Sequence, residues 1–209
     1  MKTLFLTSSV NFVAHDIAKK LDLSSKNKLV FITTAAEPKT GDKTWLSNDR
    51  QSLVDVGFDV SDYTISGKNL DQLKNDLMDY DFIYLSGGDT WYLLNQSKKS
   101  GFFILIQDLV NKKGKTYIGT SAGSIITGPK CPDYLLPDKE ILETEKQKGY
   151  GFIPFIILPH WGSDSFRKKY LGGRLEIAYK NDQFPLVTLT DNQYIYINGN
   201  KYEFVDVSK

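Results

Sequence analysis

The chain has 209 residues, of which 41% are hydrophobic and 24% charged, and its formal net charge is +1. This length can bury most of the surface that the unfolded chain exposes, and the composition is that of an ordinary globular protein. The near-neutral charge favours neither nucleic acid nor an anionic membrane as a partner. The single cysteine, Cys131, excludes an intrachain disulfide framework, and no Cys/His cluster has metal-ligand spacing. We therefore expect no metal and no cofactor.

The first residues carry one positive charge and only a short apolar run before the polar pair Ser8-Ser9. This run is too short for a signal peptide or a membrane span. We expect a cytoplasmic protein, either a monomer or a homodimer.

Short apolar runs alternate with longer amphipathic stretches along most of the chain. The short runs, each followed by Ser, Thr, Gly or Pro, predict buried strands at Leu4–Leu6, Leu29–Ile32, Phe82–Leu85, Tyr117–Ile118 and Phe155–Leu158. The stretches between them predict helices at Phe12–Leu21, Trp45–Val56, Leu70–Asp79, Thr90–Lys99 and Phe102–Lys112. Such alternation predicts a doubly wound α/β fold, with a mostly parallel sheet covered by helices on both faces.

The segment from Leu186 to Val207 has a different pattern. It reads strand-turn-strand, with turn signals at Asp191-Asn192 and Asn198-Gly199. We expect an antiparallel hairpin or meander that closes one edge of the sheet. The chain has no internal repeat or linker, so residues 1–209 should form one domain.

The most specific motif is Gly119-x-Ser121-x-Gly123, which directly follows a predicted strand and precedes a probable helix start. A nucleophile elbow needs this context, because the serine must project from a tight, strained turn at the end of the sheet. Small residues on both sides allow the strand and the helix to approach closely. The next N–H, that of Ala122, then faces the oxyanion that forms during attack. The alternative is a turn whose small residues only permit close packing.

A serine nucleophile needs a base, and the chain has two histidines. His160 follows a predicted strand, so it should lie at the carboxyl ends of the strands, where doubly wound folds bind ligands. His15 falls within the first predicted helix and is expected to lie on the surface. We predict that His160 is the base.

The third residue of a triad must accept the proton on the far nitrogen of the histidine ring. Its expected place between Ser121 and His160 leaves Asp133, Asp138, Glu140, Glu143 and Glu145 as candidates. Asp133 ranks first because neighbouring prolines stiffen its loop, while the glutamates lie in a mixed-charge stretch typical of a solvated segment.

A second glycine pair, Gly87-Gly88, also follows a predicted strand and opens a helix that Asp89 or Thr90 could cap. Paired glycines allow backbone N–H groups to turn toward a bound group, so Gly88 is a candidate for the second oxyanion donor. The loop matches no phosphate-binding pattern, so we expect no nucleotide.

The chain resembles the dipeptidase E and cyanophycinase type of serine peptidases over nearly its whole length. The resemblance lies in the order and spacing of Ser86-Gly87-Gly88-Asp89-Thr90, Gly119-Thr120-Ser121-Ala122-Gly123 and Pro159-His160. It implies a flavodoxin-like sheet related to class I glutamine amidotransferases, and hydrolysis of aspartyl dipeptides or Asp-Arg polymers by a Ser-His-acid triad. The implied roles are Ser121 as nucleophile, His160 as base, Gly88 and Ala122 as oxyanion donors, and Asp133 as acid, with Glu143 as the alternative.

The chain departs from the dipeptidase pattern at Asp89, where that pattern carries an amide. A carboxylate there could pair with the free amino terminus of a peptide, but it would repel an acidic side chain by about 1–4 kcal/mol at about 4 Å. Arg167 or Arg174 could bind a substrate carboxylate, although arginines on a surface helix are the commoner interpretation.

Two other functions remain open at the level of sequence. One is an α/β-hydrolase esterase, although the interval between Ser121 and His160 leaves little room for the strand–helix units that such a fold places there. The other is a catalytically silent binding module on the same scaffold. The prediction that we favour is a serine peptidase that cleaves short peptides through an acyl-enzyme on Ser121.

Overall fold

The computed structural model describes residues 2–135, 147–181 and 183–208. Its main sheet has the strand order β3-β2-β4-β5-β1-β8-β9. The strands from β3 to β1 run parallel, and β8 and β9 are antiparallel additions beside β1. Their bounds are β1 (Thr3–Thr7), β2 (Lys28–Ile32), β3 (Asp59–Tyr63), β4 (Phe82–Leu85), β5 (Thr116–Thr120), β8 (Gln193–Asn198) and β9 (Lys201–Asp206).

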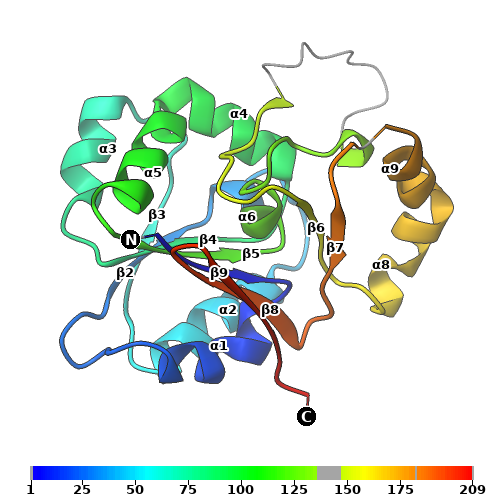
Figure 1. Ribbon diagram of the computed structural model, residues 1–209. Helices are drawn as coiled ribbons and strands as arrows, with labels where there is room; N and C mark the ends of the chain where they lie inside the picture. Colours follow the sequence, from blue (N-terminus) through cyan, green and yellow to red (C-terminus); the bar gives the residue numbers. More distant parts are fainter. Residues whose placement is uncertain (1, 136–146, 182, 209) are drawn as a thin grey trace.

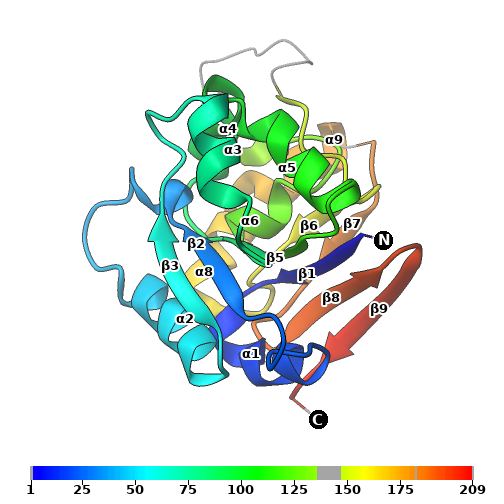
Figure 2. The same cartoon turned by 90° about the vertical axis from the view of Figure 1, so that its left-hand side faces the viewer.

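Helices cover both faces of this sheet, as Figures 1 and 2 show. On one side lie α1 (Val10–Lys19) and α2 (Thr44–Asp55). On the other side lie α3 (Leu70–Leu77), α4 (Thr90–Ser100), α5 (Phe102–Asn111) and the short α6 (Ala122–Ile125). Because side chains alternate along a strand, β1 sends Leu4 and Leu6 into the core beneath α3–α5 and Phe5 into the core beneath α1. The predicted doubly wound α/β class is thereby confirmed.

The C-terminal hairpin forms at the predicted place, with Gly199 at positive φ in the turn between β8 and β9. Two other strand predictions need correction. The predicted strand Phe155–Leu158 forms as β6 (Ile156–Leu158), but it lies outside the main sheet and pairs in parallel with β7 (Leu186–Thr188). β7 is therefore not part of an antiparallel meander. The sequence pattern does not predict the strand β3, because it is an edge strand with three polar residues, Asp59, Ser61 and Asp62, among its five.

A helical layer follows β6 and covers the end of the molecule beside it. It consists of α8 (Asp164–Lys169), a π-helical turn (Tyr170–Arg174) and α9 (Leu175–Asn181). In Figure 1 this layer lies next to β6 and β7, away from the main sheet. A 3₁₀ turn at Asp133–Leu135 packs against it through Tyr134. Within the described ranges, no helix combines the length and the apolar character that crossing a membrane requires.

Candidate active site

The candidate site lies where several strands end at the same edge. β1 and β5 are adjacent and parallel, with Thr7 paired to Thr120, so the next residues, Ser8 and Ser121, lie side by side. His160 follows β6 in the same way. Because carboxyl ends of neighbouring parallel strands meet at one edge of a sheet, the main sheet brings Ser8 and Ser121 together, and the separate β6–β7 sheet presents His160 at the same place.

Ser121 occupies a strained turn between β5 and α6. Its φ of 48° and ψ of −106° lie outside the regions that L-residues normally adopt. The glycines of the motif are needed for close packing: a Cβ on Gly119 would lie 2.6 Å from the Gly123 carbonyl oxygen, and one on Gly123 would lie 2.2 Å from the Leu85 carbonyl oxygen. The turn therefore holds the Ser121 side chain at the tip of the strand, as the sequence predicts.

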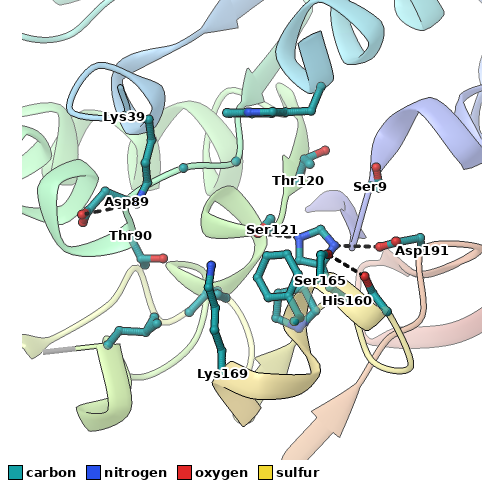
Figure 3. A pocket seen from close by; sticks show the side chains of 18 of the residues that line it. Ser9, Lys39, Asp89, Thr90, Thr120, Ser121, His160, Ser165, Lys169 and Asp191 are labelled. Carbon is teal, nitrogen blue, oxygen red and sulfur yellow. Dashed lines mark hydrogen bonds and ion pairs between the residues drawn. The ribbon is translucent and has the colours of Figure 1, made fainter. Parts of the chain in front are cut away.

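His160 connects Ser121 to a carboxylate. Its Nε2 lies 3.0 Å from Ser121 Oγ, and its Nδ1 lies 2.7 Å from Asp191 Oδ1. Figure 3 shows Ser121, His160 and Asp191 side by side in a row, with His160 in the middle. The imidazole also stacks on Phe166 of α8, with the ring centroids 4.2 Å apart. The imidazole is thus fixed at both nitrogens and on one face.

Asp133 does not occupy the position expected of the acid. Its carboxylate accepts a hydrogen bond from Lys130 Nζ at 3.1 Å, and the carboxylate that reaches His160 belongs to Asp191. The alternative, Glu143, lies outside the described residues, as do Asp138, Glu140 and Glu145. The carboxylate in contact with His160 therefore follows the histidine along the chain, whereas the sequence predicts it between Ser121 and His160.

The pair Asp191-Asn192 predicts a turn, and Asp191 does lie in one. It follows β7 and precedes β8, so it lies in a turn, but that turn is also at the carboxyl end of a parallel strand. The hydrogen bond from His160 is the largest cause that holds the pKa of Asp191 below its ordinary value, and a bond from Ser8 acts in the same direction against the effect of burial. Asp191 is therefore ionised at neutral pH and can only accept hydrogen bonds there.

A cavity of about 590 Å³ opens in front of Ser121 and His160. Its volume falls in the range of small-ligand sites. Aromatic side chains line part of its wall, including Trp45, Trp91 and Phe166. The cationic lining residues are Lys39, Lys169 and Arg174, whereas Arg167 is not among the residues that line the cavity.

The Gly87-Gly88 loop borders Ser121 directly. A Cβ on Gly87 would lie 3.3 Å from the Ser121 Cβ, and Gly88, at φ 137°, packs so closely on Ala35 that a Cβ would lie 2.1 Å from its carbonyl oxygen. Both glycines line the cavity. Ala122, on the other side of Ser121, is the first residue of α6 and is buried. Backbone groups of the loop and of α6 thus flank the serine from two sides.

Asp89 has two contacts at the cavity wall. One carboxylate oxygen accepts a hydrogen bond from the Tyr92 N–H at 2.9 Å and so caps α4. The other lies 4.0 Å from Lys39 Nζ, and both side chains remain partly exposed (Figure 3). Asp89 therefore forms the predicted helix cap with one carboxylate oxygen, and its other oxygen faces Lys39 across the cavity wall.

Another carboxylate of the cavity lining, that of Asp49, is buried. Asp49 of α2 is only 2% exposed, and its oxygens accept hydrogen bonds from the Tyr84 hydroxyl at 2.9 Å and the Asn11 N–H at 3.4 Å. Burial is the main cause that raises its pKa to about 7, and the nearby Asp191 charge adds to this effect. No sequence pattern predicts a buried carboxylate at this position.

Comparisons with known proteins place the chain among the peptidases. The model of peptidase family S51 matches residues 4–205, and the chain belongs to that family. The resemblance to the dipeptidase E type is thereby confirmed, and the protein is a peptidase.

Individual relatives agree with this assignment. The chain is 28% identical to an uncharacterized peptidase of Listeria monocytogenes over 203 residues, which cover 96% of this chain and 97% of the relative. It is 30% identical to peptidase E of Shewanella denitrificans over 161 residues, 77% of this chain and 63% of that protein. The chain also superposes on the crystal structure of a Listeria monocytogenes protein assigned to peptidase E, with a TM-score of 0.83, 27% sequence identity and full coverage of both chains. A peptidase from an acI-B1 actinobacterium, at 18% identity and a TM-score of 0.73, shares the fold.

Proposed function

We propose that the protein is a serine peptidase that cleaves short peptides through an acyl-enzyme on Ser121, with His160 as the base and Asp191 as the acid. The observation that carries this proposal is the continuous chain of contacts from Ser121 Oγ to His160 Nε2 and from His160 Nδ1 to Asp191 Oδ1. A serine hydroxyl is a weak nucleophile until such a base accepts its proton.

The reaction follows from these contacts. Ser121 Oγ attacks the carbonyl carbon of the scissile amide while its proton moves to His160 Nε2. The imidazolium, stabilised by the Asp191 carboxylate, gives this proton to the leaving amine as the C–N bond breaks. Water then attacks the resulting ester, with its proton passing to His160, and His160 returns a proton to Ser121 as the peptide acid leaves.

The tetrahedral intermediate carries a negative oxygen that needs hydrogen-bond donors. We propose the N–H groups of Gly88 and Ala122 for this role. The position of the Gly87-Gly88 loop against Ser121 and the position of Ala122 at the start of α6 support the assignment.

The charges of the cavity suggest how a peptide with an acidic first residue would bind. We propose that the second oxygen of Asp89, which lies 4.0 Å from Lys39 Nζ, takes the amino terminus, and that the amino terminus replaces Lys39 as its neighbour. Lys169 and Arg174 would then take the side-chain carboxylate of an aspartyl dipeptide, and so offset the repulsion from Asp89. Both cationic residues belong to the helical layer after His160, on the wall of the same cavity.

The test compares variants of the contact chain with a matched control on a dipeptide library that includes Asp-Xaa substrates. Ser121→Ala and His160→Ala should each lower kcat/KM by at least about 10³-fold, and Asp191→Asn by about 10²–10⁴-fold. Asp133→Asn is the control, because its carboxylate contacts Lys130 and not His160. Its kcat/KM should stay within about threefold of wild type, because the substitution leaves the contacts of His160 unchanged.

Two outcomes would contradict the proposal. Wild-type turnover by Ser121→Ala would exclude the acyl-enzyme, and a larger loss in Asp133→Asn than in Asp191→Asn would reverse the choice of acid. A fluorophosphonate probe gives a readout that needs no known substrate: labelling of the wild type that disappears in Ser121→Ala supports an activated serine. No labelling at any pH would favour a binding module.

A further inference from the structure

Ser8, the residue after β1, contacts both the candidate base and the candidate acid. Its side chain is fully buried, so substrate in the cavity does not reach it. Its Oγ accepts a hydrogen bond from the His160 backbone N–H at 2.6 Å and lies 2.8 Å from Asp191 Oδ1, to which it donates. A single hydroxyl thus connects the backbone of one residue to the side chain of the other.

The proton inventory fixes the direction of each bond. The backbone N–H of His160 can only donate, and an ionised carboxylate can only accept, so the one Ser8 hydroxyl proton must point to Asp191. Asp191 Oδ1 therefore accepts from both Ser8 Oγ and His160 Nδ1–H. This arrangement leaves the Nε2 lone pair of the neutral imidazole available to Ser121. Ser8 Oγ and His160 Nδ1 lie 3.3 Å apart, side by side, with both of their protons directed to the same oxygen of Asp191.

His160 needs such support because its backbone is strained. Its φ of 58° is in the left-handed region, which costs an L-residue about 1–2 kcal/mol. The flanking strands hold part of this turn, through the Trp161 N–H to the Leu189 carbonyl at 2.9 Å and the Leu189 N–H to the Leu158 carbonyl at 3.0 Å. The His160 N–H itself donates to Ser8, which directly follows β1 of the main sheet.

We propose that Ser8 is a positioning residue that holds the His160 imidazole and the Asp191 carboxylate in one arrangement for the transfer of the Ser121 proton. This inference rests on the proposed function of His160 and Asp191. Ser8 joins β1 of the main sheet to the separate β6–β7 unit, which carries His160 and leads into Asp191. Without its hydroxyl, the two units would keep their folds but lose the contact that aligns them at the site.

The kinetic test separates alignment from binding and from general stability. Ser8→Ala should lower kcat by about 10–100-fold, the range typical of residues that orient the histidine ligands of metal sites, and should leave KM within about twofold. Ser97→Ala is the matched control, because Ser97 is also fully buried and also hydrogen-bonded, to the Tyr150 hydroxyl at 2.7 Å, but lies on α4 away from His160. Its kcat should remain that of the wild type. Ser8→Cys fills a similar space with a weaker donor and should give an intermediate kcat.

A double-mutant cycle gives a readout that a merely structural role would not produce. Because Ser8 would position His160 and Asp191 together, Ser8→Ala should lower kcat by a smaller factor in an Asp191→Ala background than in the wild type, since one of its two partners is already absent. An independent loss of the full size in that background would overturn the proposal, as would an unchanged kcat in Ser8→Ala alone.

Proton NMR tests the same contact without a substrate. The chain has two histidines, so the Nδ1–H resonance of His160 can be assigned with a His15→Gln variant. This resonance should be present in the wild type and in Ser97→Ala, and should shift or be lost to exchange in Ser8→Ala. An unchanged resonance would refute the role of Ser8. If the wild type hydrolysed no peptide and labelled with no probe, the proposed function would fail, and the NMR result would still decide whether Ser8 holds His160.

Discussion

The buried carboxyl group of Asp49 predicts an unusual dependence of stability on pH. Its pKa is raised from an ordinary 3.8 to about 7, chiefly by burial, while the bonds from Tyr84 and Asn11 oppose the shift and the Asp191 charge adds to it. Between these two values the folded state keeps a proton that the unfolded state has released, so the free energy of unfolding must fall as the pH rises. At 1.36 kcal/mol per pKa unit, the complete effect is about 4 kcal/mol, of which about 2.5 kcal/mol falls between pH 5 and pH 8.

The substitution Asp49→Asn tests this reasoning, because the amide is neutral at every pH and close in shape to the protonated acid. Urea unfolding of both proteins at pH 5 and pH 8 should show that the variant gains about 2.5 kcal/mol relative to wild type at the higher pH. Taking the difference between the two proteins cancels the titration of the other groups. Asp55→Asn, at an exposed position of the same helix, is the matched control and should run parallel to the wild type. Parallel curves for Asp49→Asn would refute the argument.

Three further predictions follow from the packing and charge of the site. Gly123→Ala should lower the free energy of unfolding by about 3 kcal/mol or more and abolish hydrolysis, because the added Cβ would lie 2.2 Å from the Leu85 carbonyl oxygen; Gly172→Ala, which meets nothing within 4 Å, should stay near wild type in the same urea titration. Blocking the amino terminus of a dipeptide substrate should raise KM if Asp89 binds the amine, and equal cleavage of blocked and free peptides would exclude that role. Cys131 is fully buried and its pKa is raised to about 12, so a disulfide reagent should label it only after unfolding, and rapid labelling of the native protein would contradict its burial.

Local sequence patterns predicted the fold class correctly and were enough to single out Ser121 as the candidate nucleophile. The buried strands are brief runs such as Phe82–Leu85, in which every residue is buried, so their composition is distinctive wherever they occur. Ser121 could be found because the steric demands of its turn act on its immediate neighbours, Gly119 and Gly123. His160 could be found because it follows a strand, and carboxyl ends of strands gather at one edge. β3 has polar residues at three of its five positions, Asp59, Ser61 and Asp62, so it does not form the apolar run that indicates a buried strand.

The groups that surround the histidine could be identified only from the folded chain. Asp191 and Ser8 are 31 and 152 positions from His160 in the chain, and no local rule relates residues so far apart. The Asp191-Asn192 pair has the composition of a turn and does form one, so its sequence could not distinguish a turn residue from an acid that serves His160. The separate pairing of β6 with β7 brings both Asp191 and His160 to the edge where β1 and β5 end. Asp133, in contrast, forms an ion pair with Lys130. Neighbours in the chain were enough to predict the fold class and the tight turn at Ser121, because both depend on local packing. The partners of His160 depend on how two sheets meet, and this is settled only when the chain has folded.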